Sequence, residues 1–194
     1  NVLLTRVLGG LGQPGKTQVP TVYPDYFGLS AGTPERKFDP AAANKLLDDA
    51  GYRKGADGIR TDKQGKPIKL RLMGRNSDAT HQQMADFIKP WLKEIGIDVE
   101  ASMVSSTQVN NDSTLGKYDL YFTGWGIGPD PDFQLSINTC ASRPKADGSG
   151  NTSENNWCSP AFDDLYRKQH SELDPAKRAD LVKQAYSELY KADV

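Results

Sequence analysis

The sequence contains few of the residues that most often carry chemistry, and it lacks a long hydrophobic run. Two histidines and two cysteines occur among its 194 residues, and no apolar stretch approaches the about 20 residues that a membrane-spanning helix requires. The 24 basic and 25 acidic residues are interspersed and give a formal net charge of −1. Because no basic stripe is present to follow a phosphate backbone, nucleic acid is not an expected partner.

Catalytic and metal-binding patterns are equally scarce. His81 and His170 lie far apart, and neither has a second histidine or a cysteine at metal-ligand spacing, so both are expected on the polar surface. A glycine cluster at 9–12 lacks the preceding strand and the following helix of a phosphate-binding loop. The sequence therefore predicts a protein that is not an enzyme and uses no metal and no cofactor.

Asp130 and Asp132 form a pair of neighbouring carboxylates that could serve acid–base chemistry. They flank Pro131, and a helix is expected directly after them over 133–138. A rigid turn followed by a helix N-cap explains this arrangement more simply. A hydrolase that uses both carboxylates stays open as an alternative.

The two cysteines bracket a stretch at 142–156 that is too rich in glycine, serine and asparagine to form a core element. A disulfide between Cys140 and Cys158 would close a loop of about 18 residues and would stabilise the fold by about 3 kcal/mol in the chain-entropy model. Two unrelated buried thiols are the alternative. We favour the disulfide, which would imply an oxidising compartment.

Periodicity and helix-start signals divide the chain into an opening segment at 1–38, expected to wrap a larger body, and an α/β body at 39–194. Apolar residues at helical spacing, several preceded by Asp-Pro or Ser-Pro, predict helices at 39–51, 79–95, 108–115 and 133–138, with two more that begin at Ser159 and Asp174. We expect Pro90 to kink the second of these helices.

Alternating apolar residues predict the strands. They indicate a hairpin of 59–61 with 68–72 and further strands at 97–104 and 118–125. Strands that alternate with helices are typical of a layered α/β fold with crossover helices. The sequence therefore predicts an α/β protein with a mixed sheet flanked by helices.

Three stretches, taken together and in this order, resemble the oligopeptide- and dipeptide-type solute-binding proteins of ABC importers (family 5). The first is FDPAAANKLL at 38–47, which continues to AGY at 50–52. The second is LKEIGIDV at 92–99. The third is YDL at 118–120, followed by GWG at 124–126 and the PDPD turn at 129–132. Each stretch alone is weakly specific, but the resemblance covers nearly the whole chain.

In that family, two lobes close over a ligand, and residues 1–194 resemble the second lobe. The resemblance implies a periplasmic-binding-protein-like (type II) fold in which 1–194 form a single ligand-binding lobe. The chain begins at Asn1 and ends within a helical pattern, so we expect a fragment that lacks the N-terminal lobe.

The resemblance also implies a location and partners. Family members are exported, either periplasmic or lipid-anchored on the outer face of the cell membrane, and deliver their ligand to an ABC-transporter permease. We expect a monomer. Family members of the dipeptide type carry a comparable cysteine pair, which agrees with a disulfide here.

Four positions are expected at the ligand site from the resemblance and from the chemistry of peptide binding. Gly124 and Gly126 would let an extended peptide approach the backbone closely, and Trp125 would provide a flat apolar wall, unless it is a core aromatic. Arg75 lies where dipeptide binders carry an arginine for the ligand carboxylate, which suits a planar guanidinium that donates two parallel hydrogen bonds. A plain surface arginine is the alternative.

One position departs from the family pattern. Peptide binders place an aspartate three residues after this tryptophan to pair with the ligand's α-amino group, and here that position is Gly128. Asp130 or Asp132 could substitute through a shifted loop, so both join the expected ligand-binding residues. A blocked peptide, an oligosaccharide or another small solute stays open as the ligand, as does a signalling role in which the loaded protein docks on a membrane receptor.

Overall fold

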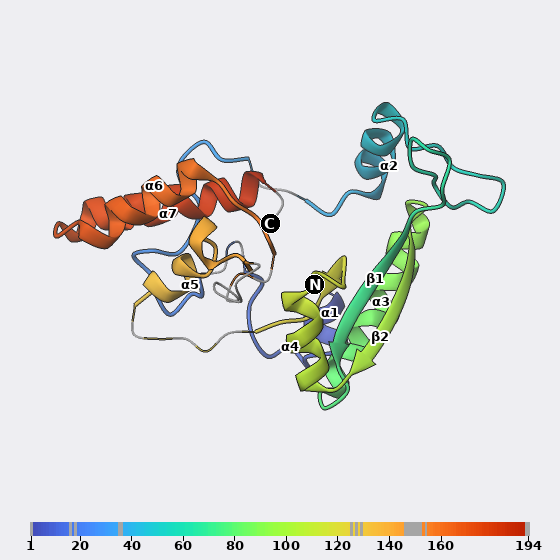
Figure 1. Cartoon of the computed structure of the whole chain (residues 1–194), viewed down its shortest axis with the longest axis horizontal. Coiled ribbons are helices and arrows are strands. Elements are labelled where there is room, and N and C mark those ends of the chain that lie inside the picture. Colours follow the sequence, from blue (N-terminus) through green and yellow to red (C-terminus); the bar gives the residue numbers. More distant parts are fainter. Residues whose placement is uncertain are drawn as a thin grey trace. The chain divides into compact units, whose positions relative to one another are not determined.

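The computed structural model describes residues 2–15, 17, 19–34, 37–124, 126, 128, 130–145, 153 and 155–192. Its elements, labelled in Figure 1 where there is room, are α1 (Val2–Arg6), α2 (Pro40–Asp49), β1 (Lys69–Arg75), α3 (Ala79–Glu94), β2 (Asp98–Val104), α4 (Ser106–Thr114), β3 (Leu120–Tyr121), α5 (Asp132–Ser136), the 3₁₀ turn η1 (Cys140–Ser142), α6 (Pro160–Ser171) and α7 (Pro175–Lys191). Contacts group the chain into two compact units. The first comprises Asn1–Gly12, Arg36–Ser113 and Lys117–Thr123, and the second comprises Gln13–Glu35, Thr114–Gly116 and Gly124–Val194.

The first unit is built on a three-stranded sheet in the order β2-β1-β3. All its named strands run parallel, and β1 pairs with β2 along its whole length, from Lys69 to Arg75. Helix α3 connects β1 to β2 and runs alongside them (Figure 1). Leu72, Ala85 and Val99 form the buried centre between helix and sheet. This unit confirms the predicted α/β class.

The strands differ from the sequence prediction in two places. The predicted hairpin of 59–61 with 68–72 is only partly formed: Thr61 and Pro67 form an isolated antiparallel bridge, and the Ile68 N–H donates to the Arg60 carbonyl at 2.7 Å, whereas 69–72 belong to the parallel strand β1. The strand predicted at 118–125 is only two residues long in β3. Alternation alone could not set these limits, because a strand extends only as far as a neighbouring strand offers hydrogen-bond partners.

Helix α2 contributes no buried residue. A buried arginine instead joins it to the rest of the first unit. Arg60 is 1% exposed. Its guanidinium donates to the Asp48 carboxylate (2.6 Å), the Asn44 side-chain oxygen (2.8 Å), the Ile95 carbonyl (2.7 Å) and the Tyr52 carbonyl. Every N–H of a buried guanidinium needs an acceptor, so one side chain ties α2 to the end of α3.

Helix starts were the most reliable part of the sequence analysis. Asp39, Ser159 and Asp174 each accept a backbone N–H in the first turn of α2, α6 and α7, and proline follows each of them. The helix predicted at 79–95 is α3, and Pro90 lies within it. A cap followed by proline is local information, which explains why the sequence was sufficient here.

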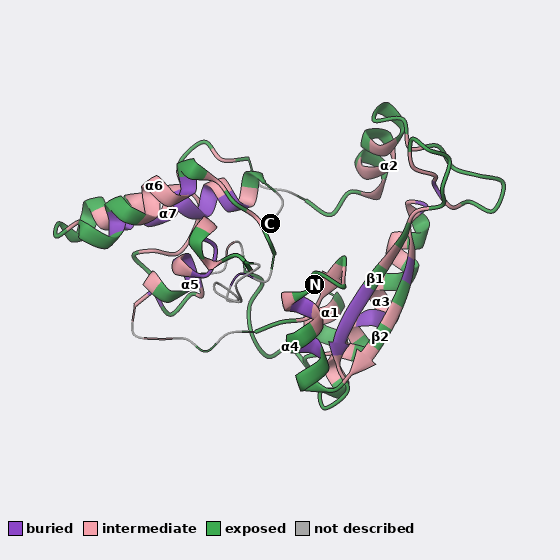
Figure 2. Ribbon diagram, in the orientation of Figure 1, coloured by how far each residue is buried: buried purple, intermediate pink, exposed green. Residues whose placement is uncertain are grey.

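The second unit has its own core, formed largely by α6 and α7. Eight buried residues contribute to it: Val19, Tyr23, Leu135, Phe162, Val182, Ala185, Tyr186 and Leu189. Figure 2 shows buried positions along α6 and α7, on the sides where these helices meet. Val19 and Tyr23 come from the opening segment, so that segment contributes side chains to this core.

The predicted disulfide is confirmed. Cys140 and Cys158 are bonded and connect η1 to the residues that precede α6. The backbone N–H of Cys140 also donates to the carboxylate of Asp163, at 3.0 Å. The bond closes a loop within the second unit.

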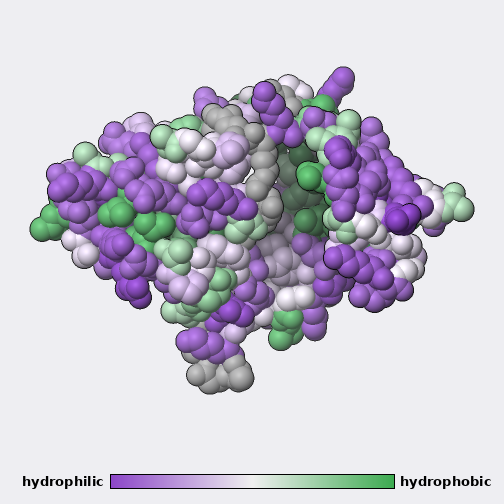
Figure 3. Space-filling model, turned by 90° about the horizontal axis from the view of Figure 1, so that it is seen from above, coloured by the Kyte–Doolittle hydropathy of each residue, from purple (hydrophilic) through white to green (hydrophobic). Residues whose placement is uncertain are grey.

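The described helices are too short or too polar to span a bilayer. The surface in Figure 3 is mostly hydrophilic and carries scattered hydrophobic side chains. Among the large hydrophobic side chains of the described residues, the most exposed are Leu173 at 95%, and Phe38 and Leu11 at 79% each.

Candidate functional site

Arg75 is the last residue of β1, at the carboxyl end of the parallel sheet. Helices α3 and α4 both begin within four residues of a strand's carboxyl end, because α3 follows β1 and α4 follows β2. Open parallel sheets bind ligands outside the carboxyl ends of their strands, and helix N-termini favour negative groups. The position of Arg75 therefore suits an anionic part of a ligand.

The guanidinium of Arg75 has two weak, neutral contacts. Nη1 donates to the Phe122 carbonyl and Nη2 to the Asn110 side-chain oxygen, both at 3.3 Å. No acidic residue in the described part of the chain forms an ion pair with Arg75. Asp78, in the same unit, feels the Arg75 charge, which contributes to the lowered pKa of that carboxyl, but it forms no direct ion pair with the guanidinium.

Three other arginines, unlike Arg75, form ion pairs. Their guanidiniums lie 2.6–2.9 Å from an aspartate oxygen, in the pairs Arg60–Asp48, Arg71–Asp119 and Arg178–Asp130. The Arg71 guanidinium also holds the pKa of Asp119 below its usual value. A half-buried arginine without such a partner is the chemical feature that distinguishes the end of β1.

His81 packs beside Arg75, although the sequence analysis assigned it to the polar surface. Its side chain is 13% exposed, and its ring is stacked on Phe122 with 5.0 Å between ring centroids. Its Nδ1 accepts the backbone N–H of Arg75 at 3.0 Å. The expectation was wrong because a polar first turn of a helix gives no sign of which side chain will meet a strand. His170, by contrast, is 65% exposed, as expected.

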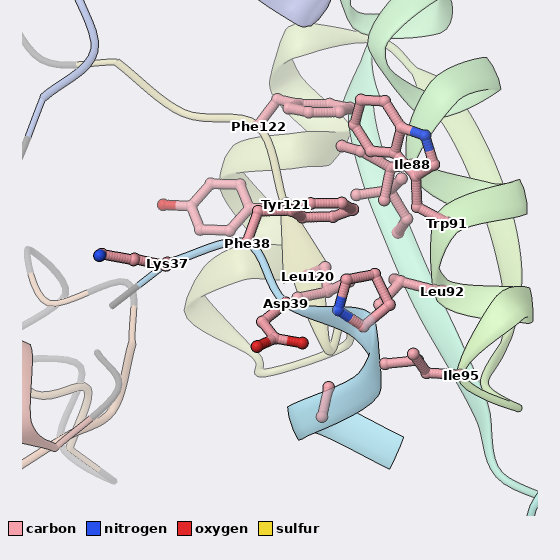
Figure 4. Close-up of a pocket in the computed structure, with 13 residues that line it drawn as sticks. Lys37, Phe38, Asp39, Ile88, Trp91, Leu92, Ile95, Leu120, Tyr121 and Phe122 are labelled. Atoms are coloured by element: carbon pink, nitrogen blue, oxygen red, sulfur yellow. The ribbon is translucent and has the colours of Figure 1, made fainter. Parts of the chain in front are cut away.

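An apolar cavity of about 550 Å³ lies on the β3 side of the first unit. Figure 4 shows its lining by Phe38, Ile88, Trp91, Leu92, Leu120 and Phe122. Phe122 connects this cavity to the arginine, because its side chain lines the cavity and its carbonyl accepts Arg75. The apolar spacing at 79–95 predicted the helix α3, but the cavity itself depends on tertiary packing.

The glycines predicted to contact ligand lie in the second unit. Gly124 and Gly126 are exposed, and an added Cβ at either would meet no atom within 4 Å. The loop is held at its far end, because the Gly126 carbonyl accepts from Gln134 at 3.3 Å and the Gly128 carbonyl accepts from the Tyr23 hydroxyl. Trp125, the third expected residue of this stretch, lies outside the described residues.

Asp130 and Asp132 are both engaged within the second unit. The Arg178 fork donates to both oxygens of Asp130, at 2.6 and 2.7 Å, and this pairing lowers the pKa of Asp130. Oδ1 of Asp132 accepts from Gln169 at 2.6 Å and lies 3.0 Å from Nδ1 of His170. The backbone N–H of Asp132 also donates to Asp130, at 2.8 Å. These contacts suit a pair of carboxylates that hold a turn, and their role toward a ligand stays a prediction.

No cluster of metal-ligating side chains occurs in the part of the chain that the structure describes. In the first unit, the candidate site comprises Arg75 and its neighbours at the carboxyl end of β1. The exposed glycines at 124 and 126 belong to the second unit.

Comparison with known proteins places this site in a family. The chain matches the profile of bacterial extracellular solute-binding proteins, family 5 (middle region), over residues 1–146. The dipeptide-binding protein of Escherichia coli (strain K12) is 24% identical over 187 residues, which cover 95% of this chain and 32% of that protein. Protein XP55 of Streptomyces lividans is 30% identical over 190 residues, 98% of this chain and 32% of that protein.

A solved structure agrees with the sequence matches. The oligopeptide-binding protein of an ABC transporter from Thermotoga maritima, with mannohexaose bound, superposes with a TM-score of 0.86 at 21% identity and covers 98% of this chain and 36% of that one. At this identity the match establishes the fold, which is that of a periplasmic binding protein. The chain spans about a third of the length of these relatives.

The proteins it resembles bind solutes and are not enzymes, which confirms the expectation of a non-enzymatic protein. The profile covers most of the chain, and sequence and fold point to the same family. The chain belongs to the bacterial extracellular solute-binding proteins, family 5.

Proposed function

We propose that this chain is one lobe of an extracytoplasmic binding protein that captures peptide-like ligands for an ABC importer. The observation that carries the proposal is the Arg75 guanidinium, which has only neutral partners at the carboxyl end of β1. The related dipeptide-binding protein of Escherichia coli supports a peptide as the ligand. A free peptide carries a terminal carboxylate, the group that a guanidinium binds best.

The proposed mechanism is closure of two lobes around the ligand. Residues 1–194 form one lobe, and the other lobe belongs to the remaining part of a longer polypeptide, since relatives are about three times as long as the matched region. A ligand cleft buries most of its ligand only when both walls are present, and hinged closure provides the second wall. We propose a monomer that passes its ligand to an ABC-transporter permease.

The proposed location is outside the cytoplasm, either in the periplasm or at the outer face of the membrane on a lipid anchor. The family's description as extracellular supports this location. The Cys140–Cys158 disulfide supports it independently, because such bonds persist in oxidising compartments.

A non-peptide solute is the second candidate ligand, and two observations favour it. The Thermotoga maritima relative was solved with mannohexaose bound. Gly128 replaces the aspartate that would pair with a peptide's α-amino group, and both nearby carboxylates already have internal partners. The hydrolase alternative has no such support, because the family comprises binding proteins.

The test compares two peptides that differ only at the carboxyl terminus. Tri-alanine and its C-terminal amide are titrated calorimetrically into the full-length two-lobed protein and into its Arg75→Ala variant. We expect the wild type to prefer the free acid, and Arg75→Ala to weaken binding of the acid by about 1–3 kcal/mol, or roughly 5- to 150-fold, with little effect on the amide. Arg75→Lys should retain only part of the preference, because it keeps the charge but not the fork.

Arg71→Ala is the matched control, because Arg71 lies on the same strand and already pairs with Asp119. It should leave the ratio of the two affinities unchanged. Equal affinity of wild-type protein for acid and amide would remove Arg75 from the site. Binding of an oligosaccharide with no affinity for either peptide would favour the second candidate.

A further inference from the structure

The backbone N–H of Arg75 points toward the β3 side of the sheet but has a side chain as its acceptor. The carbonyls of Arg71 and Met73 accept N–H groups from Asp119 and Phe122, at 3.0 and 2.9 Å. Because backbone groups alternate along a strand, every second residue of β1 faces this side. Arg75 continues the series two residues beyond Met73, and its N–H donates to Nδ1 of His81. An imidazole thus takes the place that a strand residue would occupy.

The His81 ring is held by the start of α3, by stacking and by the limited space around it. Its backbone N–H donates to the Asp78 carbonyl at 3.2 Å, in the first turn of α3. One face of the ring stacks on Phe122, with 21° between the planes. Gly74 leaves the room, since an added Cβ there would lie 3.1 Å from the His81 Cβ and 3.1 Å from the Phe122 ring. The ring can therefore move little without displacing the end of β1.

His81 contacts the main chain of Arg75 directly and is linked to its guanidinium through Phe122. It accepts the main-chain N–H directly, and it packs on Phe122, whose carbonyl accepts guanidinium Nη1. An imidazole nitrogen that accepts a hydrogen bond carries no proton. In this geometry the proton of neutral His81 is on Nε2, which lies 3.6 Å from the carboxylate of Asp78.

We propose that His81 is a positioning residue for Arg75: its Nδ1 holds the backbone of Arg75 beside Phe122, whose carbonyl accepts the guanidinium, so His81 sets how strongly the site prefers a ligand carboxylate. The inference rests on the proposed function of Arg75 and deepens it. A fork–fork hydrogen bond depends on orientation as well as charge, so a loosened guanidinium keeps its attraction for an anion but loses its geometric preference.

Two substitutions separate the acceptor from the packing. His81→Phe keeps an aromatic ring against Phe122 and removes the acceptor. His81→Asn places a carboxamide oxygen where Nδ1 lies and removes the ring that stacks on Phe122. Both are made in the full-length protein and titrated with tri-alanine and its amide. The measured quantity is the ratio of the two dissociation constants, with the thermal midpoint as a check of folding.

We expect His81→Phe to lower the acid-over-amide ratio about tenfold, and His81→Asn to keep most of it. The double variant Arg75→Ala/His81→Phe should show the same ratio as Arg75→Ala alone, because there is no longer a guanidinium to position. Should His81→Phe fail to fold, His81→Gln replaces it. Its oxygen reaches the Nε2 position and not the Nδ1 position, so the ratio should fall in Gln and persist in Asn.

Three outcomes would overturn the inference. An unchanged ratio in His81→Phe, or in His81→Gln where Phe does not fold, shows that the acceptor is not needed. An equal loss of affinity for both peptides shows a purely structural role. If Arg75→Ala removes the preference for the acid and the His81 variants do not, only the positioning role fails. If the wild type has no preference for the acid, or if Arg75→Ala leaves that preference unchanged, the proposed function of Arg75 fails as well.

Discussion

Neighbouring carboxylates in the second unit take different partners, and this difference gives each its own role. Asp130 receives the Arg178 fork, whose guanidinium also lies 5.6 Å from the centre of the Tyr26 ring. Asp132 meets α6 through Gln169, which is fully buried. The first contact is between charges, whereas the second includes a buried amide.

Replacing Arg178 by methionine should reveal the charged contact. We expect a loss of about 1 kcal/mol in the free energy of unfolding at pH 7, a modest value because Asp130 is 42% exposed and water screens the pair. Arg178 lowers the pKa of folded Asp130. The contribution is therefore fully present above about pH 4, the usual pKa of an unfolded aspartate, and is lost as the pH falls through the lower pKa of the folded protein.

Urea denaturation of the wild type and Arg178→Met at pH 7 and pH 3 measures this difference. Arg167→Met is the control, because Arg167 is 72% exposed and lies 3.4 Å from Asp164; it should have little effect at either pH. A difference that stays constant between the two pH values would show that Arg178 acts by packing and not by charge.

Single residues were predicted unevenly from the sequence. Arg75, Gly124 and Gly126 were selected largely from the resemblance, and their role at a ligand site stays a prediction. His81 was missed because its partner, a backbone N–H of another element, has no signature in the residues around it. Pairing of this kind is set by tertiary contacts, which local sequence does not encode.

At the scale of elements, the disulfide joins two helical pieces that the local sequence could not hold together. It links η1 to the start of α6, and the intervening stretch was predicted to lack core residues. Helix α6 then packs along α7 to bury Phe162 and Val182. The bond therefore limits how far η1 and the start of α6 can separate in the unfolded chain.

Replacing both Cys140 and Cys158 by serine should lower the free energy of unfolding by about 3 kcal/mol, because the unfolded chain regains the entropy of the open loop. Denaturant titration with and without a reducing agent measures this. Reduction of the wild type should give the same loss, whereas the double variant should not respond to the reductant. Equal stability of oxidised and reduced wild-type protein would contradict a stabilising role.

Helices were easier to predict than strands for a physical reason. The starts of α2, α6 and α7 are written in two adjacent residues, a cap and a proline. The end of β3 depends on which residues of β1 lie opposite, and only Leu72 and Met73 do. Just beyond β3, the Phe122 N–H still donates to the Met73 carbonyl at 2.9 Å, so an alternating pattern at 118–125 does not indicate where the strand ends.

At the scale of the whole molecule, two compact units each have a core of their own, and the chain covers about a third of its relatives. The sequence predicted the α/β class and the family, but not the path of the opening segment. Val19 and Tyr23 join a core whose other residues begin more than a hundred positions later. Contacts between residues so distant in sequence produce no periodic pattern in a short apolar stretch.

The proposed two-lobed mechanism predicts that residues 1–194 alone bind a ligand poorly. We expect tri-alanine to bind this chain about 100-fold more weakly than the full-length protein, or not measurably, because one wall leaves most of the ligand in water. Calorimetry on the two proteins at equal concentration tests this, with circular dichroism to verify that the shorter chain is folded. Equal affinities would show that one lobe forms the complete site.

The buried Arg60 has a consequence for the motif at 38–52, which carried much of the family resemblance. Asn44 and Asp48 are not core residues; they are acceptors for a guanidinium that arrives from later in the chain. A substitution at either position would leave part of the buried Arg60 guanidinium without a hydrogen-bond acceptor. The loss of stability would therefore arise at Arg60 and not at the helix surface where the substitution is made. Mutational tolerance along α2 should therefore follow the reach of one distant side chain, so that solvent exposure is a poor guide to which of its positions can vary.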